Sequence, residues 1–89
     1  WHLASVLVDP ARRWPLIAAL REAGIGAAHH YPAVHLQPVY QDLMPGLEGT
    51  CPQAEAYCAG QITLPLFEGL GRSEVSLITS TLKDLLLGD

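Results

Sequence analysis

The sequence is poor in charged side chains and contains almost no lysine. Only 16% of its 89 residues are charged, five of them are basic, and Lys83 is the single lysine. The basic residues are scattered and the formal net charge is −4, which excludes the clustered basic face of a nucleic-acid-binding surface. A hydrophobic content of 49% excludes a disordered segment. So little charge on a small domain predicts an apolar surface that another domain or subunit covers.

Long apolar runs and cysteines are also scarce. No run approaches the roughly 18–20 residues of a transmembrane helix, so we expect a soluble protein without a membrane span. Cys51 and Cys58 are the only cysteines, and they lie about 10 Å apart along a predicted helix. A disulfide needs Cα atoms within about 7 Å, so we expect two reduced thiols, which are typical of a cytoplasmic protein.

The chain begins with Trp1 instead of methionine, and no charged segment of a signal peptide precedes its first apolar stretch. Its length suits one domain. We therefore expect residues 1–89 to form a single domain cut from a longer polypeptide.

Hydrophobic patterning alternates between strand and helix three times along the chain. Residues 3–8, 25–31 and 61–67 predict strands. The last of these strands should lie at an edge or leave the sheet at Pro65, because proline has no N–H to donate. Together these elements predict an α+β fold, a three-stranded and mainly antiparallel sheet with helices packed on one face.

Helical spacing and end signals place four helical segments between and after these strands. The first begins near Arg13 with Pro15 in its first turn and ends at Gly24. A proline-rich loop over residues 32–49 holds one turn near residues 39–43, and a short helix over residues 51–59 follows. The last helix has Gly71 and Glu74 at its N-cap and N3 positions. Its apolar stripe consists of Val75, Ile78, Leu82 and Leu85.

Several common kinds of active site are missing from the sequence. His29 and His30 are adjacent on a predicted strand and point to opposite faces, which argues against a shared metal ion, and His2 and His35 do not complete a set. No serine lies in a Gly-x-Ser-x-Gly turn, and Gly24-x-Gly26 lacks the rest of a phosphate-binding loop. Lys83 is interpreted as a solvated charge.

Three ordered motifs resemble a known family. They are the segment GIGAAHHYPAVHLQPVY at residues 24–40, then Cys51-Pro52-x-Ala54-Glu55, then Leu64-Pro65-Leu66-Phe67-x-Gly69-Leu70. In this order they resemble the C-terminal small domain of the DegT/DnrJ/EryC1/StrS sugar aminotransferases, and the likeness covers essentially the whole chain. The departures are His29, where the family often has valine, and Gly71, which replaces the usual Thr or Ser cap.

The resemblance implies a pyridoxal-phosphate enzyme of the aspartate-aminotransferase fold type, a homodimer that moves an amino group from glutamate to a keto group of a nucleotide-linked sugar. The cofactor supplies the difficult chemistry. The family binds it through a lysine of the large domain, and Lys83 does not match that lysine's motif. The resemblance therefore implies that this chain alone is inactive and depends on its own large domain.

The resemblance also implies which residues meet the substrate. His35, within His-Leu-Gln-Pro, would face the active-site cleft and donate to a sugar hydroxyl or a phosphate oxygen; the alternative is a histidine that packs the loop. Tyr31 and Gln37 are weaker candidates, because Tyr31 could pack in the core or hinge and Gln37 could tie down the loop backbone. Trp1 and Trp14 are expected to be packing residues. A different class of function, a free-standing interaction or ligand-binding domain, stays open.

Overall fold

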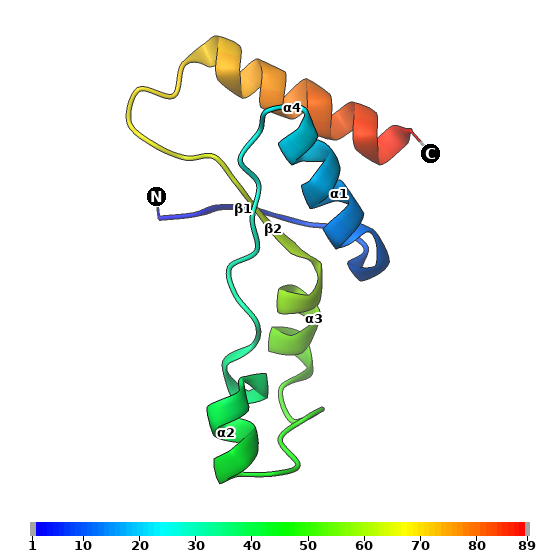
Figure 1. Ribbon diagram of the computed structural model, residues 1–89, viewed down its shortest axis with the longest axis vertical. Helices are drawn as coiled ribbons and strands as arrows, with labels where there is room; N and C mark the ends of the chain where they lie inside the picture. Colours follow the sequence, from blue (N-terminus) through cyan, green and yellow to red (C-terminus); the bar gives the residue numbers. More distant parts are fainter. Residues whose placement is uncertain (1, 89) are drawn as a thin grey trace.

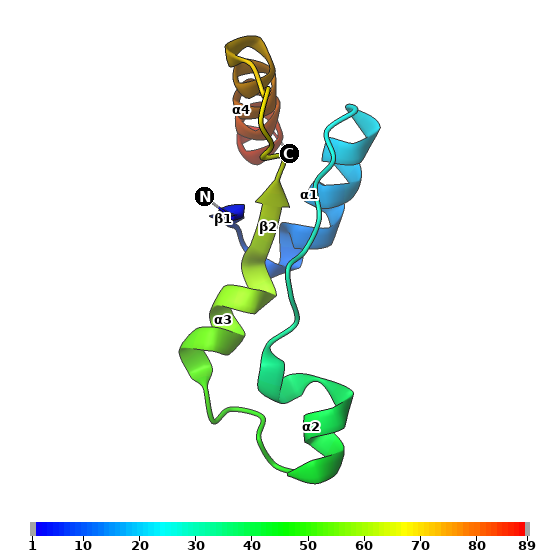
Figure 2. The ribbon, with the colours of Figure 1, turned by 90° about the vertical axis from the view of Figure 1, so that its left-hand side faces the viewer.

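The computed structural model describes residues 2–88, so the expected packing role of Trp1 lies outside the described residues. A body and a projecting arm make up the molecule (Figures 1 and 2). Its radius of gyration is 15.2 Å, against roughly 12 Å for a compact domain of this length. In chain order the elements are β1 (Ala4–Leu7), α1 (Pro10–Glu22), the 3-10 turn η1 (Val34–Leu36), α2 (Pro38–Leu43), α3 (Pro52–Gly60), β2 (Gln61–Leu64) and α4 (Arg72–Leu87).

The sheet has two strands among the described residues, and they run antiparallel with Val6 opposite Ile62. The α+β class is confirmed, but the third strand predicted over residues 25–31 is wrong. Only Ala28 bridges to Thr63. Two residues further along the chain, where His30 would pair with the backbone of Gln61, the His30 N–H donates instead to the side-chain oxygen of Gln61 at 2.9 Å. This side chain takes the place of a main-chain partner, so the ladder stops after a single bridge.

The helix α1 begins earlier than the sequence suggested. Asp9 caps it by accepting the Ala11 N–H at 3.0 Å, and Pro10 occupies the first helical position, which proline favours because its N–H is not needed there. Pro15 therefore lies inside the helix instead of in its first turn. The predicted end is confirmed, since Gly24 follows the helix with φ 84°, a left-handed conformation that suits glycine.

The remaining boundaries agree with the sequence. The turn α2 and the helix α3 lie where they were expected, and β2 ends at Leu64, directly before Pro65. Gly71 is the N-cap of α4, and its N–H donates to the carboxylate of Glu74. No helix among the described residues has the length and apolar character that crossing a membrane requires.

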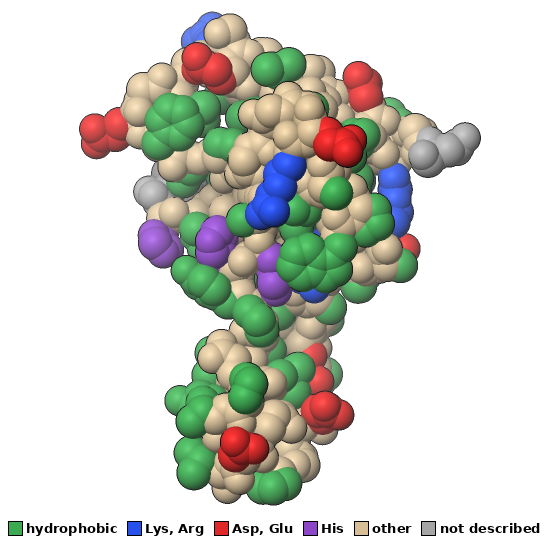
Figure 3. Space-filling model, viewed as in Figure 1, with side chains coloured by type: hydrophobic (Ala, Val, Ile, Leu, Met, Phe, Trp, Pro, Cys, Tyr) green, Lys and Arg blue, Asp and Glu red, His purple; other side chains and the backbone are tan. Residues whose placement is uncertain are grey.

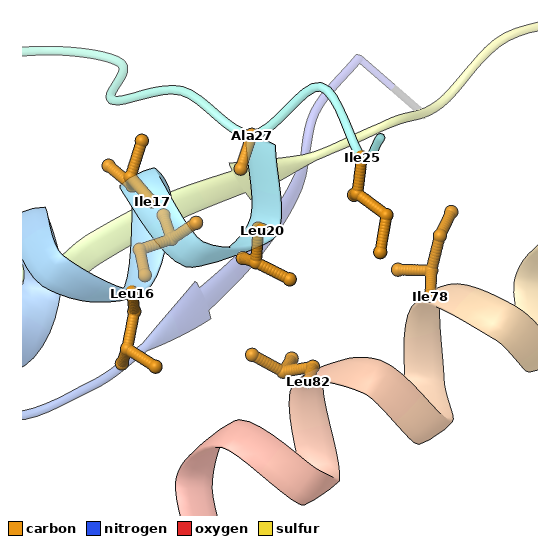
Figure 4. Packing of buried hydrophobic residues seen from close by; sticks show 8 residues of the cluster. Leu16, Ile17, Leu20, Ile25, Ala27, Ile78 and Leu82 are labelled. Atoms are coloured by element: carbon orange, nitrogen blue, oxygen red, sulfur yellow. The ribbon is translucent and has the colours of Figure 1, made fainter. Parts of the chain in front are cut away.

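The hydrophobic core joins α1, β2 and α4 (Figure 4). Ile62 of β2 is fully buried, and the loop after α1 adds two further side chains. In α4 the predicted stripe is buried at its centre, whereas Val75 at one end is exposed. The cluster consists of Leu16, Ile17, Leu20, Ile25, Ala27, Ile62, Ile78 and Leu82. The two long helices thus share one core with a strand of the sheet.

Arg12 of α1 ties the end of α4 to the body. Its guanidinium donates to the carbonyl oxygens of Leu85 at 2.9 Å and Leu86 at 3.2 Å. The last carbonyls of a helix have no partner within the helix and carry partial negative charge. Because α4 has no basic residue in its own last turn, α1 supplies the cation.

We expect Arg12→Ala to lower the free energy of unfolding by roughly 1.5–3 kcal/mol, the range for hydrogen bonds from a charged group. Arg72→Ala is the matched control, because Arg72 is exposed on the same helix α4. Denaturant unfolding of both variants measures the difference. Equal losses would show that the cap contributes nothing.

Candidate functional site

All three site residues predicted from the sequence lie on the segment from residue 28 to residue 37, which runs from the body into the arm (Figure 1). Histidine side chains gather near this junction in the space-filling view, and hydrophobic side chains cover much of the arm below it (Figure 3). The contacts of this segment therefore determine which of its side chains are available to bind a ligand.

Gln61 anchors the segment to the sheet. Its side chain is fully buried, and its oxygen accepts the backbone N–H of His30. Its amide nitrogen donates to Ser5 Oγ at 2.9 Å and to Thr63 Oγ1 at 2.6 Å. A buried amide is tolerated only when its polar atoms are paired, so these contacts fix the position of the segment beside the strands.

His29 lies on the side of the segment that faces α1. Its Nδ1 is 3.2 Å from Gln61 Oε1 and 3.0 Å from an amino nitrogen of Arg13. That Arg13 nitrogen also donates to the Cys58 carbonyl oxygen at 2.6 Å. The Trp14 ring meets the His29 ring edge-on at 5.8 Å between centroids. Arg13 therefore links α1 to both the segment and α3.

His30 is a residue that the sequence analysis considered only as a metal ligand. Its Nδ1 lies 2.8 Å from Thr63 Oγ1, and its ring packs edge-on against Tyr31 at 4.8 Å between centroids. Tyr31 itself is 59% exposed, so its predicted alternative as a core residue is wrong. One sequence signal could have identified His30: Gln61 and Thr63 alternate on a buried strand, and such polar positions require polar partners.

His35 lies in the 3-10 turn η1. Its Nε2 is 3.1 Å from Glu55 Oε2 of α3, and its side chain is only 14% exposed. The Glu55 carboxylate also accepts the backbone N–H groups of Gly49 and Cys51. The Gly49 hydrogen bond most of all, then the nearby His35 side chain and the Cys51 N–H, hold the pKa of Glu55 below its ordinary value. His35 thus takes part in fastening the arm.

Gln37 holds loop backbone, as its alternative interpretation proposed. Its amide nitrogen lies 3.4 Å from the carbonyl oxygen of Pro32, and Gln41 donates to the His35 carbonyl oxygen at 3.0 Å. No hydrogen bond among residues 2–88 joins the side chains of Tyr31, His35 and Gln37. The structure therefore places the three candidates on one segment without bringing them together.

A cleft of about 250 Å³ opens between α1, the segment and α3. Arg13, Trp14 and His29 line one part of it, and Glu55 and Cys58 line another. Trp14 is 57% exposed, so it does not pack in the hydrophobic core. Its ring instead carries the Arg13 guanidinium, whose carbon lies 4.6 Å from the ring centroid, an arrangement that suits a cation on an aromatic face.

The described residues hold no group of three or more His, Cys, Asp or Glu side chains placed to bind a metal ion. Both cysteines are free thiols. Lys83 is exposed on α4, a helix that contributes nothing to the segment or the cleft. The cleft itself is lined by charged, aromatic and imidazole side chains, among them Arg13, Glu55 and His29.

The fold defines a small α+β domain that presents a polar segment, with Lys83 on a different element, α4. The model of the DegT/DnrJ/EryC1/StrS aminotransferase family matches residues 1–83, and the chain belongs to this family.

Two solved structures are similar to it. S. venezuelae DesV, in complex with a ketimine intermediate, is 31% identical with a TM-score of 0.87, over 100% of this chain and 24% of DesV. Helicobacter pylori PseC, an aminotransferase involved in the biosynthesis of pseudoaminic acid, shares the fold. It is 24% identical with a TM-score of 0.79, over 93% of this chain and 23% of PseC. The chain thus spans about a quarter of the length of these relatives.

The Gln61 network yields a stability prediction. Gln61→Met keeps the length of the side chain but leaves the His30 N–H without a partner, so we expect the free energy of unfolding to fall by roughly 2–4 kcal/mol. Gln53→Met on the exposed surface of α3 is the control and should change little. A fall of similar size in both variants, measured by denaturant unfolding, would contradict the assignment.

The Glu55 contacts yield a pH prediction. Because its pKa is lowered in the folded state, its stabilising effect is complete above the ordinary glutamate range and is lost as the pH falls below about 4. The amide proton shifts of Gly49 and Cys51 should therefore titrate together in this acid range. Glu55→Gln should abolish the titration, whereas Glu48→Gln should not. Persistence in Glu55→Gln would disprove the linkage.

Proposed function

We propose that this chain is the small domain of a pyridoxal-phosphate-dependent aminotransferase that transfers an amino group from glutamate to the keto group of a nucleotide-linked sugar. The observation that carries the proposal is the likeness to DesV, which extends over 100% of this chain. The family match over residues 1–83 supports the same class of reaction.

The residues of this chain do not fit the cofactor. Covalent attachment of pyridoxal phosphate needs a lysine amine held at the cofactor, and Lys83 stands exposed on α4, away from the polar segment. We therefore assign the cofactor to the large domain of the complete polypeptide. The 89-residue chain would contribute side chains that bind and orient the sugar, and it would be inactive alone.

Within the proposal, Tyr31, His35 and Gln37 contact the sugar or its phosphates. Tyr31 supports this role because its side chain is exposed while its neighbour His30 is held by the sheet. His35 can donate to an anionic oxygen, although in this structure its Nε2 faces Glu55. Gln37 has further hydrogen-bonding capacity beyond its contact with Pro32.

The proposal includes a homodimer and a cytoplasmic location. Exposed apolar side chains, among them Leu43 and Met44 on the arm, support a surface that other parts of the assembly cover. The two free thiols support a reducing compartment. The alternative, a free-standing binding domain, shares the lack of a cofactor lysine. The complete gene distinguishes the two, since the enzyme requires a large domain with a lysine motif.

The first test concerns the cofactor. In the complete polypeptide we expect Lys83→Ala to leave both the cofactor absorbance and the borohydride-trapped adduct unchanged, because the attaching lysine lies elsewhere. The isolated 89-residue chain should form no stoichiometric adduct. Mass spectrometry of the trapped protein locates the modified lysine, and an adduct on Lys83 would refute the assignment.

The second test separates a substrate contact from a structural role at His35. In the complete enzyme, His35→Ala should slow the half-reaction with the nucleotide sugar about ten- to hundredfold, the range for losing one hydrogen bond to a charged group. The glutamate half-reaction should be nearly unchanged. Rapid-mixing measurements of each half-reaction give the two rates separately.

Glu55→Gln is the matched control, because it weakens the ion pair in the arm and keeps the imidazole. It should leave the sugar half-reaction close to that of the unmodified enzyme. If Glu55→Gln and His35→Ala slow the sugar half-reaction equally, or if His35→Ala slows both half-reactions equally, His35 acts through the fold and does not touch the substrate.

A further inference from the structure

The strand β1 has one paired edge and one open edge. The Val8 N–H donates to the Gly60 carbonyl oxygen at 2.9 Å, and this pair is in register with Val6 opposite Ile62. Hydrogen-bonded pairs alternate along an antiparallel ladder. The backbone groups of Val6 and Val8 therefore point toward β2, whereas those of Ser5 and Leu7 point away from it.

The other side of β2 confirms this alternation. Thr63, which stands opposite Ser5, exchanges both of its backbone hydrogen bonds with Ala28, at 2.7 and 3.1 Å. Thr63 thus uses its outward groups, whereas Ser5 and Leu7 receive no backbone partner from residues 2–88. Unpaired groups along a strand are a template for another strand.

A groove reaches the same open edge of β1. Its volume is about 680 Å³, and Leu3, Ala4, Ser5 and Val6 all line it. Successive residues of a strand point to opposite faces, so Ala4 and Val6 share one face of the sheet with Leu64, which stands opposite Ala4. The groove lies over this face and, through Leu3 and Ser5, reaches the open edge of β1. Leu64 of β2, Tyr57 of α3 and Leu66 beyond β2 also line it, and no charged residue does.

We propose that the open edge of β1 accepts an extended, apolar segment from the rest of the same polypeptide, which pairs with the backbone of Ser5 and Leu7 as an added strand. Main-chain hydrogen bonds would hold the segment, and apolar side chains would enter the groove, which is the general mode of strand addition. This inference rests on the proposed function, in which the chain is one domain of a longer aminotransferase.

Two observations favour the same polypeptide over a separate molecule. The chain corresponds to only 24% of DesV, so a protein of that kind has ample further polypeptide to supply a segment. The edge is also short, since β1 has four residues and only two of them point outward. A separate partner loses translational and rotational freedom on binding, and so few hydrogen bonds compensate only weakly for that loss. A segment of the same polypeptide is already tethered and loses far less.

Amide hydrogen exchange in the complete polypeptide tests the proposal directly. We expect the Ser5 and Leu7 amides to exchange at least about 100-fold more slowly than unstructured amides, at every protein concentration. Exchange of both at unprotected rates would overturn the proposal. Protection that disappears when the protein is diluted to a monomer would also overturn it, by assigning the edge to a second copy.

A pair of variants at Leu7 gives a second, independent measurement. Leu7 is 60% exposed and its N–H points outward, so Leu7→Pro removes the outward donor without removing a bond to β2. In the complete polypeptide, Leu7→Pro should lower the melting temperature by several degrees more than Leu7→Ala, which keeps the N–H. Equal melting temperatures would contradict an added strand.

The proposed aminotransferase function and the added strand at β1 can be rejected separately. Cofactor binding and amino transfer by the complete polypeptide, together with unprotected Ser5 and Leu7 amides, would leave the proposed function standing and reject only the added strand. Conversely, protected amides in a polypeptide that binds no pyridoxal phosphate would reject the proposed function and retain the strand-accepting edge.

Discussion

The buried side chain of Gln61 is the interaction on which the arrangement of this domain depends. Its amide group joins β1 through Ser5, β2 through Thr63 and the connecting segment through His30. A polar group removed from water must find partners within the protein. The residues around Gln61 are therefore constrained in position, and the strand that carries it separates two environments. Ile62 enters the hydrophobic core, while Gln61 and Thr63 form a polar layer on the opposite face.

This polar layer determines how the histidine-rich segment meets the rest of the molecule. His29 and His30 point to different partners, Arg13 on one side and Thr63 on the other. These contacts hold the two rings in fixed orientations. Further along the segment, His35 is fixed by a separate set of contacts around Glu55. The body and the arm thus hold their histidines through separate sets of contacts.

Sequence reasoning succeeded where the signals were local. Gly24 after α1, Pro65 after β2 and the apolar centre of α4 each act within a few residues, and each was placed correctly. It was wrong at the start of α1, which it placed near Arg13, although Asp9 caps the helix and Pro10 is its first residue. The remaining differences come from distant contacts. The sequence does not indicate that the side chain of Gln61 would accept the backbone N–H of His30, thirty-one positions away, in place of a main-chain partner. It also does not indicate that Glu55 would contact the imidazole of His35.

The contact between Arg12 and the end of α4 links the length of α4 to the residue that α1 carries at position 12. The carbonyls that Arg12 meets belong to Leu85 and Leu86, which lie just beyond residue 83, where the family match ends. In a homologue whose final helix ends one turn earlier, the carbonyl groups that correspond to those of Leu85 and Leu86 are missing. An arginine at the position of Arg12 would then have no helix end to cap. Across the family, the length of the final helix and the presence of this arginine should therefore vary together. A deletion at the end of the helix would be correlated with a substitution of the arginine more than seventy residues away.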